Sequence, residues 1–280
     1  MNTPFAKKAL RLAGLAATTI LALMPASQAR QQSAGPNLNV AGNEMEERME
    51  LSNMDALGDK DEVAAYQKFS TAEEVSKKIE LGSKFLQKYP KSPLAERVDV
   101  GLMNAYHSQQ DWKDCYQSAN AALALQPDDV DVLTTVGWTI PHVYNPSDSD
   151  ADQELNTAET YAKHAIEVLA KMPKPTGMNS AEFAAAKQKR ALQAHSALGL
   201  VYFRRDDYDN SAKELEQSTK GNPNPDPTDL FVLGSDLQNL GRYGEASAAY
   251  GGCSQIAGPL QNQCKQNADL TKAQAQSRAK

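Results

Sequence analysis

The chain has 280 residues, with 29 basic and 35 acidic side chains and a formal net charge of −6. This length allows one sizeable core or a stack of smaller ones, and the scarcity of aromatic residues (6%) beside abundant alanine favours helix. The acidic balance, without a basic cluster beyond the first residues, argues against nucleic acid as a partner.

Residues 1–29 have the pattern of a secretory signal peptide. Three positive charges near the start precede a largely apolar run of 13 residues from Leu12 to Met24, and small side chains at Ser27 and Ala29 favour cleavage after Ala29. The run is too short to cross a hydrocarbon core of about 30 Å. We therefore expect an exported protein without a membrane span after signal cleavage, periplasmic in a Gram-negative cell and secreted otherwise. Cleavage would change the net charge from −6 to −9, because the three charges are lost.

The chain beyond the signal changes character near residue 58. Residues 30–58 are polar and lack a steady apolar period, which predicts a flexible lead-in. From residue 59 onward, apolar residues recur every three or four positions, as in amphipathic helices. Prolines that end helices follow one another at intervals of 37, 46, 50 and 36 residues: Pro90, Pro127, Pro173, Pro223 and Pro259. These intervals predict a helical repeat with insertions.

A short motif recurs within this helical part. It contains a Leu-Gly pair, an aromatic residue three positions later, a second aromatic residue after a tight turn, then small, large and small residues. Two copies are offset by 35 residues: Leu198, Gly199, Tyr202, Tyr208, Ser211, Leu215, Ser218 and Pro223, then Leu233, Gly234, Leu237, Gly241, Tyr243, Ala246, Tyr250 and Cys253. A third copy has Met103 in place of the Gly: Leu102, Tyr106, Trp112, Cys115, Ala119, Ala122 and Pro127. A fourth begins at Val136, Gly137 and Ile140 and resumes at Ala158 after about nine extra residues.

This motif resembles the tetratricopeptide repeat. The resemblance implies an all-α fold, a right-handed superhelical stack of antiparallel helix pairs in which glycine and small residues allow close approach. It implies a repeat domain at residues 59–258 and a polar C-terminal capping helix at 259–280. The expected units lie near residues 60–90, 96–129, 130–172, 192–225 and 227–258. An irregular helical bundle is the alternative.

The first helix of each tetratricopeptide unit lines a concave groove, and such grooves bind extended peptides or helices. Aromatic, amide and Arg side chains at the matching positions suit this kind of docking. The partner-binding residues implied in this way are Asn104, His107, Trp138, Phe203, Arg204, Phe231, Gln238 and Asn239. For Trp138 and Phe203, packing in the core is the alternative interpretation.

Three cysteines remain after the signal. Cys253 and Cys264 are 11 residues apart on either side of a Gly-Pro turn, and export to an oxidising compartment favours a disulfide between them. Two buried, reduced thiols are the alternative. Cys115 occupies a small-residue position of the repeat, so we expect a buried, unreactive thiol there.

Residues typical of catalysis do not form a recognisable set. The four histidines lack the spacing of metal ligands, and neither a nucleophile elbow nor a phosphate-binding loop occurs, so we expect no enzyme, no metal and no cofactor. Asp148, Asp150, Asp152 and Glu159 have the spacing of calcium ligands, but Gln153 stands where such a loop needs glycine. We interpret this segment as a solvated loop that caps the next helix.

The sequence therefore predicts a non-catalytic exported scaffold that binds a protein or peptide partner through its concave groove, with assembly of the cell envelope as one setting. A structural spacer that associates with itself, its groove filled by its own lead-in, is the alternative.

Overall fold

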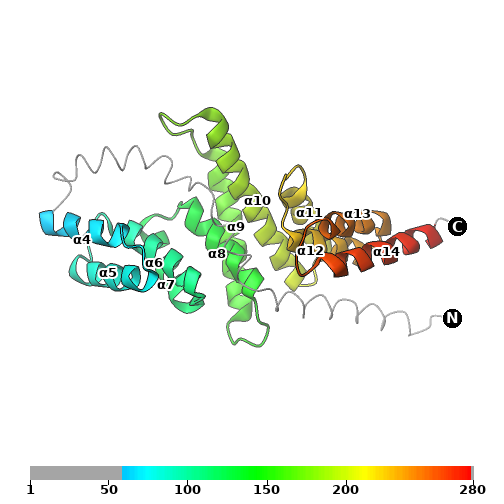
Figure 1. The fold of residues 1–280 in the computed structure, drawn as a ribbon, viewed down its shortest axis with the longest axis horizontal. Coiled ribbons are helices and arrows are strands. Elements are labelled where there is room, and N and C mark those ends of the chain that lie inside the picture. Colours follow the sequence, from blue (N-terminus) through cyan, green and yellow to red (C-terminus); the bar gives the residue numbers. More distant parts are fainter. Residues whose placement is uncertain (1–58, 279–280) are drawn as a thin grey trace. The chain divides into compact units, whose positions relative to one another are not determined.

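The fold is known from a computed structural model that describes residues 59–278. Eleven helices, α4 to α14, make up most of this part of the chain, and it contains no strand (Figure 1). The expected all-α class is therefore confirmed. The predicted signal peptide and lead-in lie outside the described residues.

The described residues form two compact units. The first unit comprises residues 59–136 and 167–188, and the second unit comprises residues 137–166 and 189–278. Three helices contribute residues to both units: α8 (Val130–Val143), α9 (Ala151–Lys171) and α10 (Ser180–Arg204).

The first unit is built around an aromatic core. Its helices are α4 (Lys60–Ser70), α5 (Val75–Lys88), α6 (Ala95–Gln109) and α7 (Trp112–Leu125), and each packs on the next along the chain. The Phe69 ring covers Gly82 and Gly101, where a Cβ atom would lie 2.9 Å and 2.5 Å from ring carbons. Glycine at both positions thus allows one aromatic side chain to fill the space between three helices.

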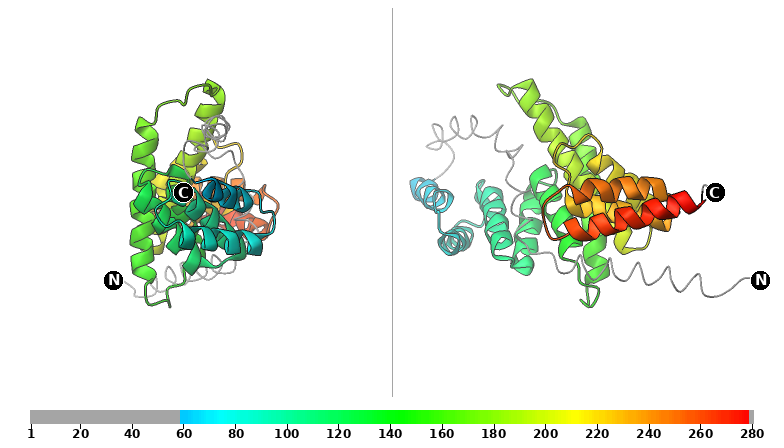
Figure 2. Two further views of the ribbon diagram at one scale, coloured as in Figure 1. Left: turned by 90° about the vertical axis from the view of Figure 1, so that its left-hand side faces the viewer. Right: turned by 45° about the vertical axis from the view of Figure 1, so that its right-hand side comes forward.

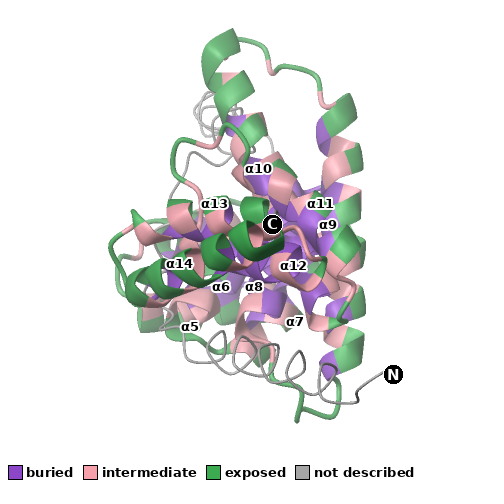
Figure 3. Cartoon of the chain, turned by 90° about the vertical axis from the view of Figure 1, so that its right-hand side faces the viewer, coloured by how far each residue is buried: buried purple, intermediate pink, exposed green. Residues whose placement is uncertain are grey.

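The second unit continues the same sequential packing. It contains α11 (Tyr208–Thr219), α12 (Pro227–Asn239), α13 (Tyr243–Ser254) and α14 (Gln261–Arg278), and each of these packs on the next. Figure 2 shows α13 and α14 side by side at the red end of the chain. In Figure 3 the buried residues of this unit face its interior, whereas much of α14 is exposed.

Three helical hairpins share one turn geometry. The turn residues Gln110, Asp206 and Gly241 have φ angles of 62°, 59° and 75°, the left-handed conformation that ends many helices. In each hairpin the following amide donates to the carbonyl five residues earlier: Asp111 to Tyr106 at 3.0 Å, Asp207 to Tyr202 at 3.0 Å and Arg242 to Leu237 at 2.8 Å. Each turn residue stands seven positions after the glycine position of the sequence motif, so the backbone repeats where the sequence repeats.

Close contact between the two helices of a hairpin explains the glycines of the motif. A Cβ atom on Gly199 would lie 2.5 Å from Cγ of Leu215, and one on Gly234 would lie 2.8 Å from the Tyr250 ring. In both hairpins the large side chain follows the glycine by 16 residues. The motif therefore encodes a specific contact as well as an amphipathic pattern.

Two loops lie on either side of α9. The first is a loop at residues 144–150, and the second is a loop at residues 172–179 that leads into α10. Helix α10 begins at Ser180, although the sequence analysis placed the start of the unit near residue 192. The Asn179 side chain accepts a hydrogen bond from the Ala181 amide at 2.7 Å and caps this longer helix.

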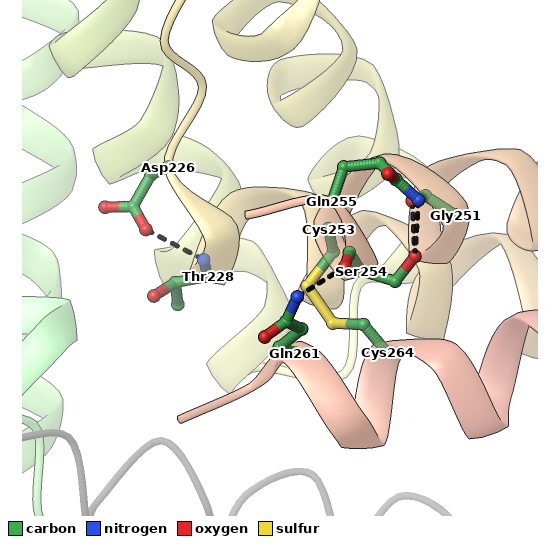
Figure 4. The surroundings of a disulfide bond; sticks show 8 residues. All are labelled: Asp226, Thr228, Gly251, Cys253, Ser254, Gln255, Gln261 and Cys264. Atoms are coloured by element: carbon green, nitrogen blue, oxygen red, sulfur yellow. Dashed lines mark hydrogen bonds between the residues drawn. A yellow bond between two sulfur atoms is a disulfide. The ribbon is translucent and has the colours of Figure 1, made fainter. Parts of the chain in front are cut away.

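The C-terminal helix closes the second unit. Leu260 and Cys264 are buried in its core, while the solvent side of α14 is polar. Ser247 Oγ on α13 donates to the Ala268 carbonyl at 2.9 Å. Cys253 and Cys264 are within disulfide distance, with Cα atoms 5.8 Å apart, and Figure 4 shows the bond that joins α13 to α14. Cys115 is a free, buried thiol, and its burial raises its pKa to about 12.

We predict that Gly199→Ala lowers the free energy of unfolding by about 1–3 kcal/mol relative to Gly251→Ala, because the new methyl group overlaps Leu215. Gly251 is the matched control, since it lies in a helix and a Cβ atom there would contact nothing within 4 Å. Urea denaturation measures the difference. Equal effects of the two substitutions would contradict the close-packing argument.

We also predict that reduction of the Cys253–Cys264 bond destabilises the chain by about 2–3 kcal/mol, because the open form regains loop entropy on unfolding. Thermal unfolding with and without reductant measures this loss. The double variant Cys253→Ala/Cys264→Ala is the control and should not respond to reductant.

Candidate partner-binding surface

Five of the eight predicted partner-binding residues reach the surface fully or in part: Asn104, His107, Arg204, Gln238 and Asn239. Asn104 is exposed on α6, and His107 is half-buried at the end of the same helix. The His107 ring lies edge-to-face against Trp112 at 5.4 Å, and burial lowers its pKa. Gln238 and Asn239 are half-buried at the end of α12, where the Gln238 amide lies 3.4 Å from Oε1 of Gln274 on α14.

The three predicted aromatic anchors are buried. Trp138, Phe203 and Phe231 are 5%, 3% and 1% exposed. Phe231 packs against the Tyr250 ring at 5.6 Å, and Phe203 against the Tyr208 ring at 6.4 Å. The sequence analysis expected exposed side chains at these positions and gave core packing as the alternative for Trp138 and Phe203. The structure shows packed side chains, as their large apolar area favours.

Arg204, the eighth predicted residue, lies against the end of α8. Its guanidinium donates through Nε and Nη2 to the Pro141 carbonyl, at 3.3 Å and 3.0 Å, and lies over the Tyr144 ring at 5.3 Å. Pro141 and Tyr144 follow Trp138 on or just beyond α8. The second unit thus brings together predicted residues from two different first helices of the motif.

His142 completes this cluster. Its ring stacks on Trp138 at 3.7 Å, and its Nδ1 lies 2.7 Å from the Trp138 carbonyl. A carbonyl only accepts, so Nδ1 carries the proton and Nε2 of the neutral ring is an acceptor. Nε2 lies 4.0 Å from Oδ2 of Asp226 and has no hydrogen-bond partner, and Nε1 of Trp138 has none either. Burial lowers the pKa of His142, and Arg204 contributes in the same direction.

The charge of Arg204 is not compensated by a carboxylate in the part of the chain that the structure describes. Burial lowers its pKa to about 10, and the only charged or polar group that acts against this is the Tyr144 hydroxyl. Arg205, the next residue, differs in this respect, because it forms an ion pair with Glu159 at 2.5 Å. We call Trp138, His142, Tyr144 and Arg204 the Arg204 cluster.

Two buried carboxyl groups on α12 serve the packing of the second unit. Asp229 Oδ1 and Oδ2 accept hydrogen bonds from Ser196 on α10 and Ser218 on α11, both at 2.8 Å. Burial raises the pKa of Asp229 to about 8. One carboxyl group therefore joins three helices.

Asp236, two helical turns later, forms a similar contact. Ser211 Oγ lies 2.8 Å from the Gly199 carbonyl and 2.5 Å from Oδ2 of Asp236. A hydroxyl has one proton and a carbonyl only accepts, so when Ser211 donates to Gly199 the Asp236 carboxyl must be the donor. Burial raises the pKa of Asp236 well above its ordinary value, which agrees with a protonated group.

Metal-binding clusters and membrane-spanning helices are both absent from residues 59–278. No group of three or more His, Cys, Asp or Glu side chains there could hold a metal ion. Asp148 of the calcium-like segment instead accepts a hydrogen bond from the Asn145 amide at 2.8 Å, and Asp152 already belongs to α9. No helix in the described part has the length and hydropathy needed to cross a bilayer.

No protein-family model matches the chain, and no curated protein matches it. Sequence reasoning missed His142, Tyr144 and Asp226, because they lie on separate segments without a shared spacing. The one available signal was the Asp226-Pro227 pair, which marks the start of a helix.

We predict that the second unit loses stability as the pH rises, because Asp229 is protonated in the folded chain and ionised in the unfolded one. The stabilisation that Asp229 contributes to the folded state is fully present below 3.8, the ordinary pKa of an Asp side chain. It is lost as the pH rises through about 8, the pKa of Asp229 in the folded chain. Urea denaturation from pH 4 to 9 measures the slope, which is at most about 1.4 kcal/mol per pH unit for one group. Asp229→Asn should remove part of this slope, and an unchanged slope would contradict a protonated Asp229.

Proposed function

We propose that this chain is an exported, non-catalytic scaffold of tetratricopeptide-like hairpins that binds a protein or peptide partner. In this proposal the hairpins stack as an α-solenoid, and the first helices of the units face the partner. The repeated turn at Gln110, Asp206 and Gly241 carries the proposal, because a shared turn and a shared sequence period are the marks of a repeat protein.

Contacts between successive first helices support the stacking. Ser196 on α10 donates to Asp229 on α12, and Arg204 on α10 donates to Pro141 on α8. In a solenoid, each first helix packs on the second helix of its own pair and on the first helix of the next pair. Gly199 beside Leu215 provides the contact within a pair. Both kinds of contact therefore occur in the second unit.

The polar groups that remain at the surface suit binding better than chemistry. The hydroxyls of Ser196, Ser211 and Ser218, which contact carboxyl groups, are buried within helix interfaces, where they support packing. Asn104, Gln238 and Asn239 offer amide groups of the kind that pair with the backbone of an extended peptide. The proposed export rests on the signal-like residues 1–29 and accords with the Cys253–Cys264 pair.

We predict that the full chain, expressed with its own N-terminus and a C-terminal tag, is recovered from the cell envelope or medium. Crosslinking should then capture a defined partner there. The triple variant Asn104→Ala/Gln238→Ala/Asn239→Ala should reduce capture at least fivefold, because it removes amide groups that the first helices of each unit present. Quantitative mass spectrometry of crosslinked material measures both results.

The matched control is the double variant Asp209→Ala/Lys213→Ala, which removes an exposed ion pair on α11, a second helix of the repeat. It should capture as much partner as the wild type. Retention of the partner by the triple variant would place the site elsewhere. Recovery of only self-crosslinked chain would favour the structural spacer instead, and retention of the chain in the cytoplasm would contradict export.

A further inference from the structure

We propose that the contact between α12 and the hairpin of α10 and α11 is a pH-sensitive joint, which is closed while Asp229 and Asp236 are protonated and opens locally when they ionise. The inference goes beyond the proposed function, because it concerns a change of conformation in the chain and needs no particular partner. Its evidence is a row of buried carboxyl and hydroxyl groups along one side of α12.

The two carboxyl groups lie on the same side of α12. Asp229 and Asp236 are seven residues apart, about two helical turns, and are 3% and 0% exposed. Asp229 contacts a hydroxyl on each helix of the preceding hairpin, and Asp236 contacts Ser211 on the second of them. Both carboxyl groups therefore face the same neighbour, and their charge affects how well α12 packs against it.

Two serine hydroxyls of this row have too few protons for their acceptors unless the carboxyl groups are protonated. Ser218 Oγ lies 2.8 Å from Oδ2 of Asp229 and 3.1 Å from the Leu215 carbonyl. Ser211 lies in the same way between Asp236 and a carbonyl of α10. A protonated carboxyl group can donate to the hydroxyl, which then donates to the carbonyl. An ionised carboxyl group instead competes with the carbonyl for one proton.

Acidic neighbours make ionisation of this row costly. Burial raises the pKa of Asp229 to about 8, with a further contribution from Asp226. Burial also raises the pKa of Asp236 well above its ordinary value, and Asp207 contributes in the same direction. His142 lies 4.0 Å from Asp226, and burial lowers the pKa of its ring, which is therefore neutral in alkaline solution. The charged groups of the described chain that act on the two carboxyl groups are thus acidic.

A charge on Asp236 would have little compensation. Its Oδ1 has no hydrogen-bond partner. The phenols of Tyr208 on α11 and Tyr250 on α13 interact electrostatically with this carboxyl group, and burial raises the pKa of both phenols, so they are neutral as well. A buried charge without a cation or a full set of hydrogen bonds is unfavourable. Ionisation therefore favours access of water to this side of α12.

The opening is expected at the joint, because other contacts hold the helices on either side of it together. Gly199 packs against Leu215 within the hairpin of α10 and α11, and Gly234 packs against Tyr250 within the next hairpin. A disulfide also joins α13 to α14 (Figure 4). Where hairpins follow one another along a chain, each interface contributes its own term to stability, so one interface can weaken while the helices remain formed.

The test is hydrogen–deuterium exchange of the full chain at about pH 6 and about pH 9.5, corrected for the intrinsic exchange rate at each pH. We expect the protection of peptides from α11 and α12 to fall by about tenfold or more between these conditions, because both helices lose packing at the joint. Peptides from α5 in the first unit and the helical circular dichroism signal should change little.

Two variants separate this joint from a general effect of alkaline solution. Asp229→Asn/Asp236→Asn introduces amides of similar shape that do not ionise, so α11 and α12 should keep their protection at the higher pH. Asp209→Asn is the matched control, because Asp209 lies on α11 with its side chain 64% exposed, and it should behave as the wild type. An equal fall in protection in the double variant and the wild type would overturn the proposal.

An NMR titration of the wild-type side-chain carboxyl carbons makes the test independent of whether the double variant folds. The signals of Asp229 and Asp236, assigned through their backbone carbons, should show protonated groups at about pH 6. Ionised groups at that pH, unchanged protection of α11 and α12 at about pH 9.5, or an equal loss of protection in α5 would each overturn the joint. Partner capture does not enter these measurements, so the joint and the proposed function can fail separately.

Discussion

The described fold depends on close approach between the two helices of each hairpin. At Gly199 and Gly234 the backbone of one helix lies so near its partner that Leu215 and Tyr250 occupy the space of a side chain. A residue in the left-handed conformation then reverses the chain direction between the two helices. In each turn the following amide donates to the carbonyl five residues earlier. These two local features orient each second helix against the first, and sequential packing builds the rest.

Polar contacts inside the second unit add specificity to this packing. Asp229 joins three helices through two serine hydroxyls, and Asp236 joins two of them through Ser211. A protonated carboxyl group both donates and accepts, so it satisfies buried hydroxyl and carbonyl groups at a lower cost than a buried charge. The interfaces between helices are thus aligned by hydrogen bonds in addition to apolar contact.

The Arg204 cluster differs from the Asp229 contact, in which both carboxyl oxygens accept hydrogen bonds. Its hydrogen bonds hold Arg204 against the end of α8, yet they leave a charge and two ring nitrogens without complete partners. Other buried polar atoms of the second unit, such as Oδ1 of Asp236, also lack a hydrogen-bond partner. The predicted aromatic residues Trp138, Phe203 and Phe231, in contrast, are buried in the core.

The sequence by itself predicted the features that depend on local order along the chain: the helices, the tight turns, the close approach of helices at the glycines of the motif, and the Cys253–Cys264 pair. Each is determined by residues close in sequence, through backbone conformation or a hairpin of known length. It placed a repeat unit near residues 192–225, and the structure shows that α10 extends further back, to Ser180. Only the tertiary structure decided that Phe203 and Phe231 are buried and that Arg204 has no acidic partner among the described residues. Burial and charge compensation depend on side chains from distant segments, and no spacing in the sequence specifies which of them meet.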